Sequence, residues 1–256
     1  MSTVQELQKI NTFHSGKNGR KALPIVPQNV EDQLSQYALQ LLRKRPAQQP
    51  VDEVLHEMEV LAEKEGIPII GPLEGAIVQM LVQMRGASSQ LVLDIGTAIG
   101  YSAIWLARGL PAGSKIISIE IDPERADLAK EFIHRSGLSD HIEVLVGDAF
   151  ELLPQLDMQF DIILQDVIKH VYFGADSQLS LRLLDLCIER LVDGGLLLGD
   201  NVFCMGEVLH QEQNSIPKQV IGIQDYNNRV ANHPQLDSVV LPVRDGLWVS
   251  QKRAVR

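Results

Sequence analysis

Short apolar runs alternate with amphipathic segments through most of the chain after residue 90. The apolar runs are rich in Ile, Leu and Val, as in strands buried on both faces, and the segments between them repeat apolar residues at helical spacing. The predicted strands are Leu91–Ile95, Lys115–Glu120, Ile142–Val146, Phe160–Gln165 and Gly195–Gly199. The predicted helices are Ser102–Gly109, Pro123–Ser136, Phe150–Leu156 and Ser177–Leu191. This alternation predicts an α/β fold with a Rossmann-like, doubly wound sheet.

The regions flanking this core have different patterns. Apolar spacing predicts helices at Val30–Lys44, Val51–Glu65, Leu73–Arg85 and Lys218–Ala231. Two apolar runs near the C-terminus, Asp237–Leu241 and Leu247–Gln251, flank a turn that contains Asp-Gly and therefore predict an antiparallel hairpin. We expect a flexible N-terminal arm at 1–23, a helical cap at 24–88 and the main domain at 89–256, with 24–256 forming one compact unit.

Composition narrows the class of protein. The chain has 256 residues, of which 45% are hydrophobic and 22% charged, as in soluble globular proteins. No apolar run approaches the roughly 20 residues that span a bilayer, and the N-terminus lacks the apolar segment of a secretory signal. The two cysteines have no CxxC spacing. These features predict a cytoplasmic protein without a membrane partner.

The net charge of −10 argues against nonspecific binding to nucleic acid, which requires Lys and Arg to neutralise phosphates. Basic residues do gather in the N-terminal arm, at Lys9, Lys17, Arg20 and Lys21. We interpret them as a solvated tail, and tRNA as a partner is disfavoured but not excluded.

Acidic residues follow or end three successive predicted strands. The first strand leads into Asp94-x-Gly96-x-x-x-Gly100, which lacks the third glycine of a GxGxxG dinucleotide loop. Glu120 ends the second strand, where it can accept hydrogen bonds from ribose hydroxyls, and Asp148 follows the third. Carboxylates repel phosphates, so the series favours an uncharged nucleoside that carries a sulfonium over NAD. Each acid by itself, Asp148 above all, has the alternative role of capping a helix.

A second group of oxygen donors follows the next two strands. Asp166 ends one, and Asp200 and Asn201 end its neighbour in a doubly wound sheet. Two carboxylates and an amide oxygen suit Mg²⁺, with Mn²⁺ or Ca²⁺ as substitutes. The alternative is that Asp200 and Asn201 only begin a turn. Lys169 lies three residues after Asp166, so its amine is a candidate general base beside the cation, or else an exposed loop lysine.

Several motifs together resemble the cation-dependent S-adenosylmethionine O-methyltransferases of the catechol and caffeoyl-coenzyme A type. They are LDIGTAIGYSAIWLA, SIEIDPERADLA, the D-x-x-K-x-x-Y of Asp166, Lys169 and Tyr172, GGLLLGDNV and LPVRDGLWVSQK. The resemblance implies a seven-stranded sheet with an antiparallel last strand and a homodimer. It implies that Asp166, Asp200 and Asn201 bind the metal and that Lys169 is the catalytic base. The implied S-adenosylmethionine-binding residues are Asp94, Gly96, Thr97, Gly100, Ser102, Glu120, Ile121, Asp148, Ala149 and Asp166.

One departure affects the expected acceptor. Family members often read F-[IV]-D-A-D-K, and here Ile168 replaces the second acid, which weakens assignment to a coenzyme A ester. Within the family, IGTAIGYSAI, Asp225-Tyr226-Asn227 and PVRDGL also look like bacterial enzymes that methylate 5-hydroxyuridine at the tRNA wobble position. We therefore expect an O-methyltransferase for a catechol-like or other small phenolic acceptor, with the wobble-uridine enzyme as the alternative. A noncatalytic nucleotide-binding module is a weaker alternative, and a dehydrogenase is disfavoured by the missing glycine.

Overall fold

The computed structural model describes residues 28–86, 88–167, 177–209 and 218–254. The chain divides into two compact units, Met1–Pro46 and Ala47–Arg256. The described part of the first unit contains helix α2 (Gln28–Leu42), and all other elements belong to the second. The predicted arm at 1–23 lies outside the described residues, and the predicted domain boundaries stay a prediction.

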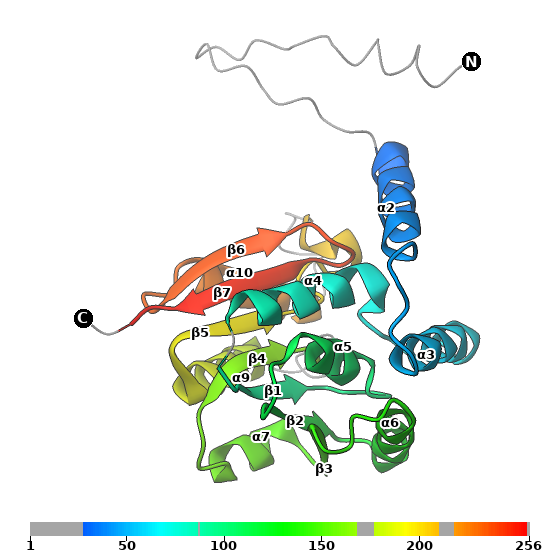
Figure 1. Ribbon diagram of the computed structural model, residues 1–256. Coiled ribbons are helices and arrows are strands. Elements are labelled where there is room, and N and C mark those ends of the chain that lie inside the picture. The colour runs from blue at the N-terminus through cyan, green and yellow to red at the C-terminus, as the bar shows by residue number, and fades with distance from the viewer. Residues whose placement is uncertain (1–27, 87, 168–176, 210–217, 255–256) are drawn as a thin grey trace. The chain divides into compact units, whose positions relative to one another are not determined.

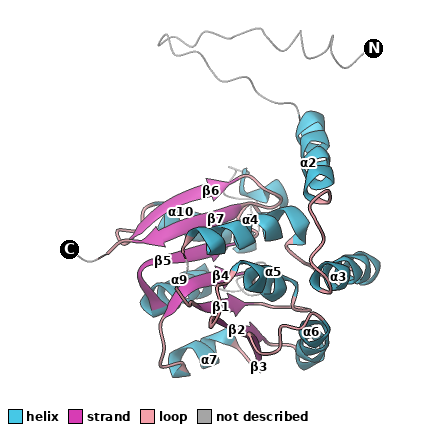
Figure 2. Ribbon diagram, in the orientation of Figure 1, coloured by secondary structure: helices cyan, strands magenta, loops and turns pink. Residues whose placement is uncertain are grey.

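The second unit alternates helices and strands along the chain (Figures 1 and 2). Its helices are α3 (Val51–Glu65), α4 (Gly71–Met84), α5 (Tyr101–Gly109), α6 (Pro123–Arg135), α7 (Ala149–Leu152), α9 (Ser177–Arg190) and α10 (Lys218–Ala231), with short 3-10 helices η1 (Leu153–Gln155) and η2 (Cys204–Leu209). Its strands are β1 (Leu91–Ile95), β2 (Lys115–Glu120), β3 (Ile142–Val146), β4 (Phe160–Gln165), β5 (Leu191–Gly199), β6 (Leu236–Leu241) and β7 (Leu247–Lys252). No helix among the described residues is both long enough and apolar enough to cross a membrane.

The seven strands form one sheet in the order β3-β2-β1-β4-β5-β7-β6. Strands β1 to β5 pair in parallel, and β7 runs antiparallel to both β5 and β6. The strand order reverses between β1 and β4, so the topological switch point lies where those two strands end. The prediction of a doubly wound, seven-stranded sheet with an antiparallel last strand is confirmed.

Helices cover both faces of the sheet. On one face, buried residues of α7, η1, α9 and α10 form one hydrophobic cluster with residues of the strands. Helices α4, α5 and α6 lie on the opposite face (Figure 2). Gly75 lets α4 approach α5 closely, because a Cβ there would lie 2.6 Å from the Trp105 ring. Helix α3 also contacts α5 and α6, so α3 and α4 extend this helical layer.

The differences between predicted and observed elements are confined to ends and to one short helix. Strand β5 begins at Leu191 rather than Gly195, because Leu191 pairs with Phe160 before the register shifts. Helix α7 ends at Leu152 and continues as the 3-10 helix η1. The sequence did not predict η2, whose first three residues all have left-handed backbone angles.

Candidate active site

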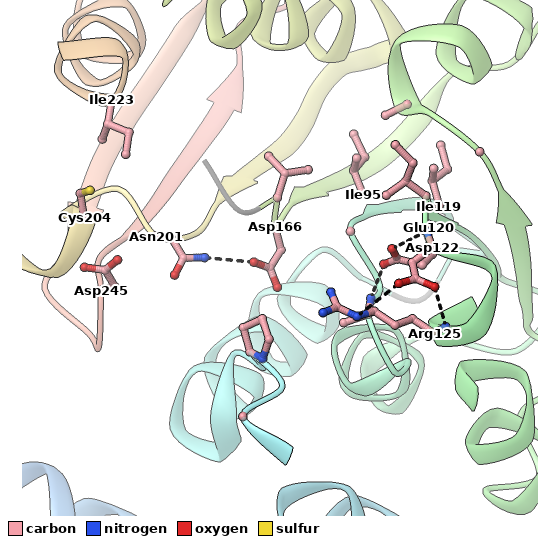
Figure 3. A pocket seen from close by; sticks show the side chains of 18 of the residues that line it. Ile95, Ile119, Glu120, Asp122, Arg125, Asp166, Asn201, Cys204, Ile223 and Asp245 are labelled. Carbon is pink, nitrogen blue, oxygen red and sulfur yellow. Dashed lines mark hydrogen bonds and ion pairs between the residues drawn. The ribbon is translucent and has the colours of Figure 1, made fainter. Parts of the chain in front are cut away.

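A cavity of about 600 Å³ lies where β1, β2, β3, β4 and β5 end (Figure 3). Glu120 and Arg125 stand at one end of it, and Cys204, Ile223 and Asp245 at the other. The predicted cofactor-binding residues that line it are Gly96, Glu120, Ile121, Ala149 and Asp166. Asp94, Thr97, Gly100, Ser102 and Asp148 do not line it. The cavity is therefore at the switch point, where open α/β sheets bind ligands.

The glycine loop forms the wall of the cavity next to β1. The backbone N–H groups of Gly96 and Thr97 both donate to the carbonyl of Ile119, at 2.9 and 3.1 Å, which fixes the loop against β2. Gly96 has a φ of 93°, and a Cβ there would lie 2.0 Å from the backbone oxygen of Asp166. The loop and the end of β4 are therefore in contact, which only a glycine at position 96 permits.

Glu120 connects β2 to the same loop. One of its carboxylate oxygens accepts from the Ala98 N–H at 2.8 Å and the other from the Asp122 N–H at 2.9 Å. Its side chain is buried but still lines the cavity. The carboxylate is thus held in one orientation, beside the space predicted to hold a ribose.

Asp94 lies beneath the loop. It is fully buried, and its carboxylate accepts from the hydroxyls of Ser118 at 2.8 Å and Ser102 at 3.1 Å. Burial raises the pKa of Asp94 to about 6, although the hydroxyls of Ser118, Thr97 and Ser102 oppose this rise. In this structure Asp94 and Ser102 therefore support the loop, and direct contact between them and a cofactor stays a prediction.

Asp94 is expected to make stability depend on pH. Because its folded pKa, about 6, exceeds its ordinary value of 3.8, ionisation opposes folding as the pH rises between these values. We expect the unfolding free energy of the native protein to fall by about 2 kcal/mol relative to Asp94→Asn between pH 4 and pH 7. Urea unfolding of both proteins across that range measures this, with the exposed Asp127→Asn as control. A constant difference between the native protein and Asp94→Asn would contradict it.

Asp148 acts as the N-cap of α7, accepting from the Phe150 N–H at 2.8 Å. The structure therefore shows Asp148 Oδ1 in the helix-capping role that was the alternative to binding a cofactor. The neighbouring Gly147 and Ala149 line the cavity instead.

Asp166, Asp200 and Asn201 come together at the ends of β4 and β5. The amide nitrogen of Asn201 donates to Asp166 Oδ1 at 3.1 Å and to Asp200 Oδ2 at 2.8 Å. Asp166 and Asn201 line the cavity between its two ends (Figure 3). Asp200 does not line it and is 4% exposed. The turn alternative is also met in part, because Asn201 has a left-handed φ of 58° and its N–H donates to Asp200. The predicted convergence of the three side chains is observed.

Glu74 is a residue that the sequence reasoning missed. It lies on α4 with no exposed surface, and burial, with the nearby carboxylates of Asp200 and Asp166, raises its pKa to about 10. The guanidinium of Arg244 acts in the opposite direction. A signal was present: Glu74 is the only charged residue between Ile67 and Met84, a stretch that is otherwise apolar except for Gln79 and Gln83. A lone acid on the buried face of a helix requires a partner or a function.

The far end of the cavity is mostly apolar. Cys204, Met205 and Ile223 line it, together with Asp245, whose carboxylate accepts from the Met205 N–H at 2.6 Å. Gly66 and Pro68, from the connector between α3 and α4, also line the cavity.

Part of the predicted site is outside the described residues, including Lys169, Ile168 and Tyr172. Within the described ranges, no three or more His, Cys, Asp or Glu side chains are arranged to hold a metal ion. The predicted set of Asp166, Asp200 and Asn201 contains only two such side chains, because its third donor is an amide.

Comparison with known proteins identifies the family. A family model described as O-methyltransferase matches residues 39–253. A catechol O-methyltransferase from Niastella koreensis is 35% identical over 196 residues, which cover 74% of this chain and 83% of the relative. A catechol O-methyltransferase from Mus musculus is 32% identical over 145 residues, or 57% of this chain and 54% of that protein.

Solved structures agree with this result. The crystal structure of an O-methyltransferase from Bacillus cereus, in complex with SAH, matches with a TM-score of 0.71 and 28% identity. The match covers 86% of this chain and 97% of that chain. The resemblance stated from the motifs and the prediction of an O-methyltransferase are both confirmed. The chain belongs to the O-methyltransferase family.

Proposed function

We propose that this enzyme uses S-adenosylmethionine and a divalent cation to methylate a hydroxyl of a catechol-like or other small phenolic acceptor. The observation that carries the proposal is the Asn201 amide, which joins the carboxylates of Asp166 and Asp200 at the wall of the cavity. The glycine loop and Glu120 lie toward one side of this group, and an apolar pocket lies toward the other. The two sides suit a nucleoside donor and an aromatic acceptor.

The nucleoside end fits S-adenosylmethionine. Glu120 is held by two backbone N–H groups with its carboxylate at the cavity, where it can accept from two ribose hydroxyls. The SAH-bound relative from Bacillus cereus supports this assignment. When bound, S-adenosylmethionine supplies a methyl group activated by its sulfonium. The wall that holds it contains Gly96, Ile121 and Ala149.

The donor set fits a hard divalent cation. Asp166 and Asp200 would repel each other if nothing lay between them, and here the partly positive amide N–H groups of Asn201 do. Turning that amide over presents its oxygen, so the three side chains offer three oxygen donors, and Mg²⁺ prefers such ligands. When bound, the cation lowers the pKa of the acceptor hydroxyl. Mn²⁺ and Ca²⁺ are alternatives with the same ligand preference.

The protein's own groups have three tasks in this proposal. Lys169 Nζ takes the proton of the acceptor hydroxyl, an assignment that rests on its spacing from Asp166 and on the family motif. The connector residues Gly66 and Pro68 cover the cavity and exclude water. Cys204, Met205 and Ile223 supply apolar surface for a planar ring, which supports a small acceptor. The family resemblance further suggests a homodimer.

A methyl-transfer assay with Mg²⁺ tests the proposal on a catechol panel and on tRNA that contains 5-hydroxyuridine. We expect methylated catechol, loss of activity in excess chelator and recovery when Mg²⁺ is restored. Full activity in chelator would disprove the metal role. Methylation of the tRNA but of no phenol would establish the wobble-uridine alternative. Calorimetric titration with S-adenosylhomocysteine and with NAD separates a methyltransferase from a dehydrogenase.

A further inference from the structure

Helix α10 carries the motif Asp225-Tyr226-Asn227, which the proposed reaction leaves without a role. The side-chain amide of Asn227 makes two hydrogen bonds. Its Nδ2 donates to the backbone carbonyl of Val202 at 2.7 Å, and its Oδ1 accepts from the indole Nε1–H of Trp248 on β7 at 2.8 Å. Because an indole N–H can only donate, the amide oxygen must face Trp248, and the amide nitrogen then faces Val202. Asn227 therefore joins α10, β7 and the segment after β5 in one fixed orientation.

The Val202 carbonyl belongs to the turn that carries two of the proposed cation ligands. Val202 directly follows Asn201, whose backbone is left-handed with a φ of 58°. Asn tolerates such angles better than most residues, but they persist only where the surrounding structure holds them. Val202 is held on both sides, because its N–H donates to a carbonyl in the turn between β6 and β7 at 3.3 Å and its carbonyl accepts from Asn227. The Asn201 amide, which joins the two acids of the proposed site, is thus carried on a turn that Asn227 fastens.

Tyr226 makes a second set of contacts from the same helix. Its hydroxyl donates to Oε1 of Gln165 at 3.1 Å, and Gln165 immediately precedes Asp166. The same hydroxyl lies against β5, because a Cβ at Gly199, the residue before Asp200, would be 2.9 Å from it. Tyr226 and Gln165 are fully buried. Helix α10 therefore contacts a residue next in sequence to each of the three proposed ligands.

We infer that Asn227 is a positioning residue of the cation site, which holds Asn201 in place through the Val202 carbonyl. The inference rests on the proposed function. Partners that orient metal ligands typically account for 10- to 100-fold in metal affinity. Asn227 does not line the cavity, so it acts on the cation only through the backbone of the turn.

Two substitutions remove the bond to Val202 in different ways. Asn227→Leu removes both hydrogen bonds at similar size, whereas Asn227→Asp keeps an oxygen that accepts from Trp248 and loses only the donor. We expect Mn²⁺ affinity, measured by calorimetry on the full chain in saturating S-adenosylhomocysteine, to fall about 10- to 100-fold in Asn227→Leu and at least about threefold in Asn227→Asp. The loss is smaller in Asn227→Asp because an added negative charge by itself attracts a cation.

The affinity for S-adenosylhomocysteine should stay within about threefold in both variants, because the nucleoside end of the cavity is formed at the ends of β1, β2 and β3 instead. Gln224→Leu is the matched control. Gln224 lies three residues earlier on α10, and its Nε2 also donates to a backbone carbonyl, that of Val208 in η2, at 2.9 Å. This variant loosens an attachment of α10 without affecting the bond to Val202, so it should keep native Mn²⁺ affinity.

Native Mn²⁺ affinity in Asn227→Leu or in Asn227→Asp would overturn the inference. An equal loss in Gln224→Leu, or a parallel loss of S-adenosylhomocysteine binding, would also overturn it, because the effect would then be a general loosening of the fold. If Asn227→Leu does not fold in a thermal unfolding measurement, Asn227→Asp decides alone. If the native protein binds no Mn²⁺, or Asp200→Asn binds it normally, the proposed function fails and the inference fails with it.

Discussion

Replacing Asp200 by alanine is expected to lower kcat/KM for methyl transfer on the order of 100- to 1,000-fold, without changing the affinity for S-adenosylhomocysteine by more than about threefold. A bound cation contributes several kcal/mol of charge stabilisation at a reacting oxygen, and each 1.4 kcal/mol corresponds to about tenfold in rate. Without Asp200, the proposed cation site keeps only one carboxylate, that of Asp166, beside the Asn201 amide. Initial rates in Mg²⁺ and calorimetry with S-adenosylhomocysteine measure the two effects separately.

The exposed acid Asp127 on α6 provides the control for Asp200→Ala, because it pairs only with Lys130 at the surface among the described residues. Asp127→Ala should retain native activity. Loss of both activity and S-adenosylhomocysteine binding in Asp200→Ala would indicate a folding defect, since Asp200 is buried, and thermal unfolding would detect it. Native activity in Asp200→Ala would exclude Asp200 as a ligand.

The fold could be predicted because its core strands are buried on both faces. Leu91–Ile95 and Phe160–Gln165 are mostly apolar, each with a single aspartate inside the run (Asp94 and Asp161), and each strand occupies the predicted residues. Helix α6 begins at Pro123, as predicted, and the Asp122 carboxylate caps it by accepting from the backbone N–H groups of Glu124 and Arg125. Such signals are local, and neighbours along the chain are enough to determine them.

The position of each acid relative to the cavity could not be predicted in the same way. Asp94, Glu120 and Asp148 follow similar patterns at the ends of β1, β2 and β3, yet only Glu120 lines the cavity. Asp94 is one residue before the end of its strand, so its side chain points beneath the loop toward Ser102 and Ser118. Successive side chains of a strand point to opposite faces of the sheet, so a shift of one position decides whether an acid faces the cavity.

Contacts between distant elements were also beyond the sequence. Glu74 on α4 is buried near enough to Asp200, which follows β5, for that carboxylate to raise its pKa, and no spacing rule links two residues so far apart in the chain. The apolar end of the cavity combines Met205 of η2 with Ile223 of α10. Cys204 and Met205, which both line the cavity, have left-handed backbone angles. Neither residue type favours that conformation, so the sequence could not predict it.

Gly96→Ala is expected to destabilise the protein by about 4 kcal/mol or more and to abolish binding of S-adenosylhomocysteine. A left-handed φ costs a residue with a Cβ about 1–2 kcal/mol, and the new Cβ would lie 2.0 Å from the backbone oxygen of Asp166, which is not free to move as a side-chain tip is. Asp166 is held there by its N–H bond to Ile95, so relief of the clash must displace either the loop or the end of β4.

Gly137→Ala separates the two causes of the Gly96→Ala effect, because Gly137 also has a left-handed φ, 74°, but no atom within 4 Å of its added Cβ. Urea unfolding should show a loss of about 1 kcal/mol in Gly137→Ala, with S-adenosylhomocysteine binding retained. The excess loss in Gly96→Ala then measures the contact between the glycine loop and Asp166. One side of that contact belongs to the nucleoside end of the cavity and the other to the proposed cation site. Equal losses of unfolding free energy in the two variants would mean that Gly96 does not couple these two ends.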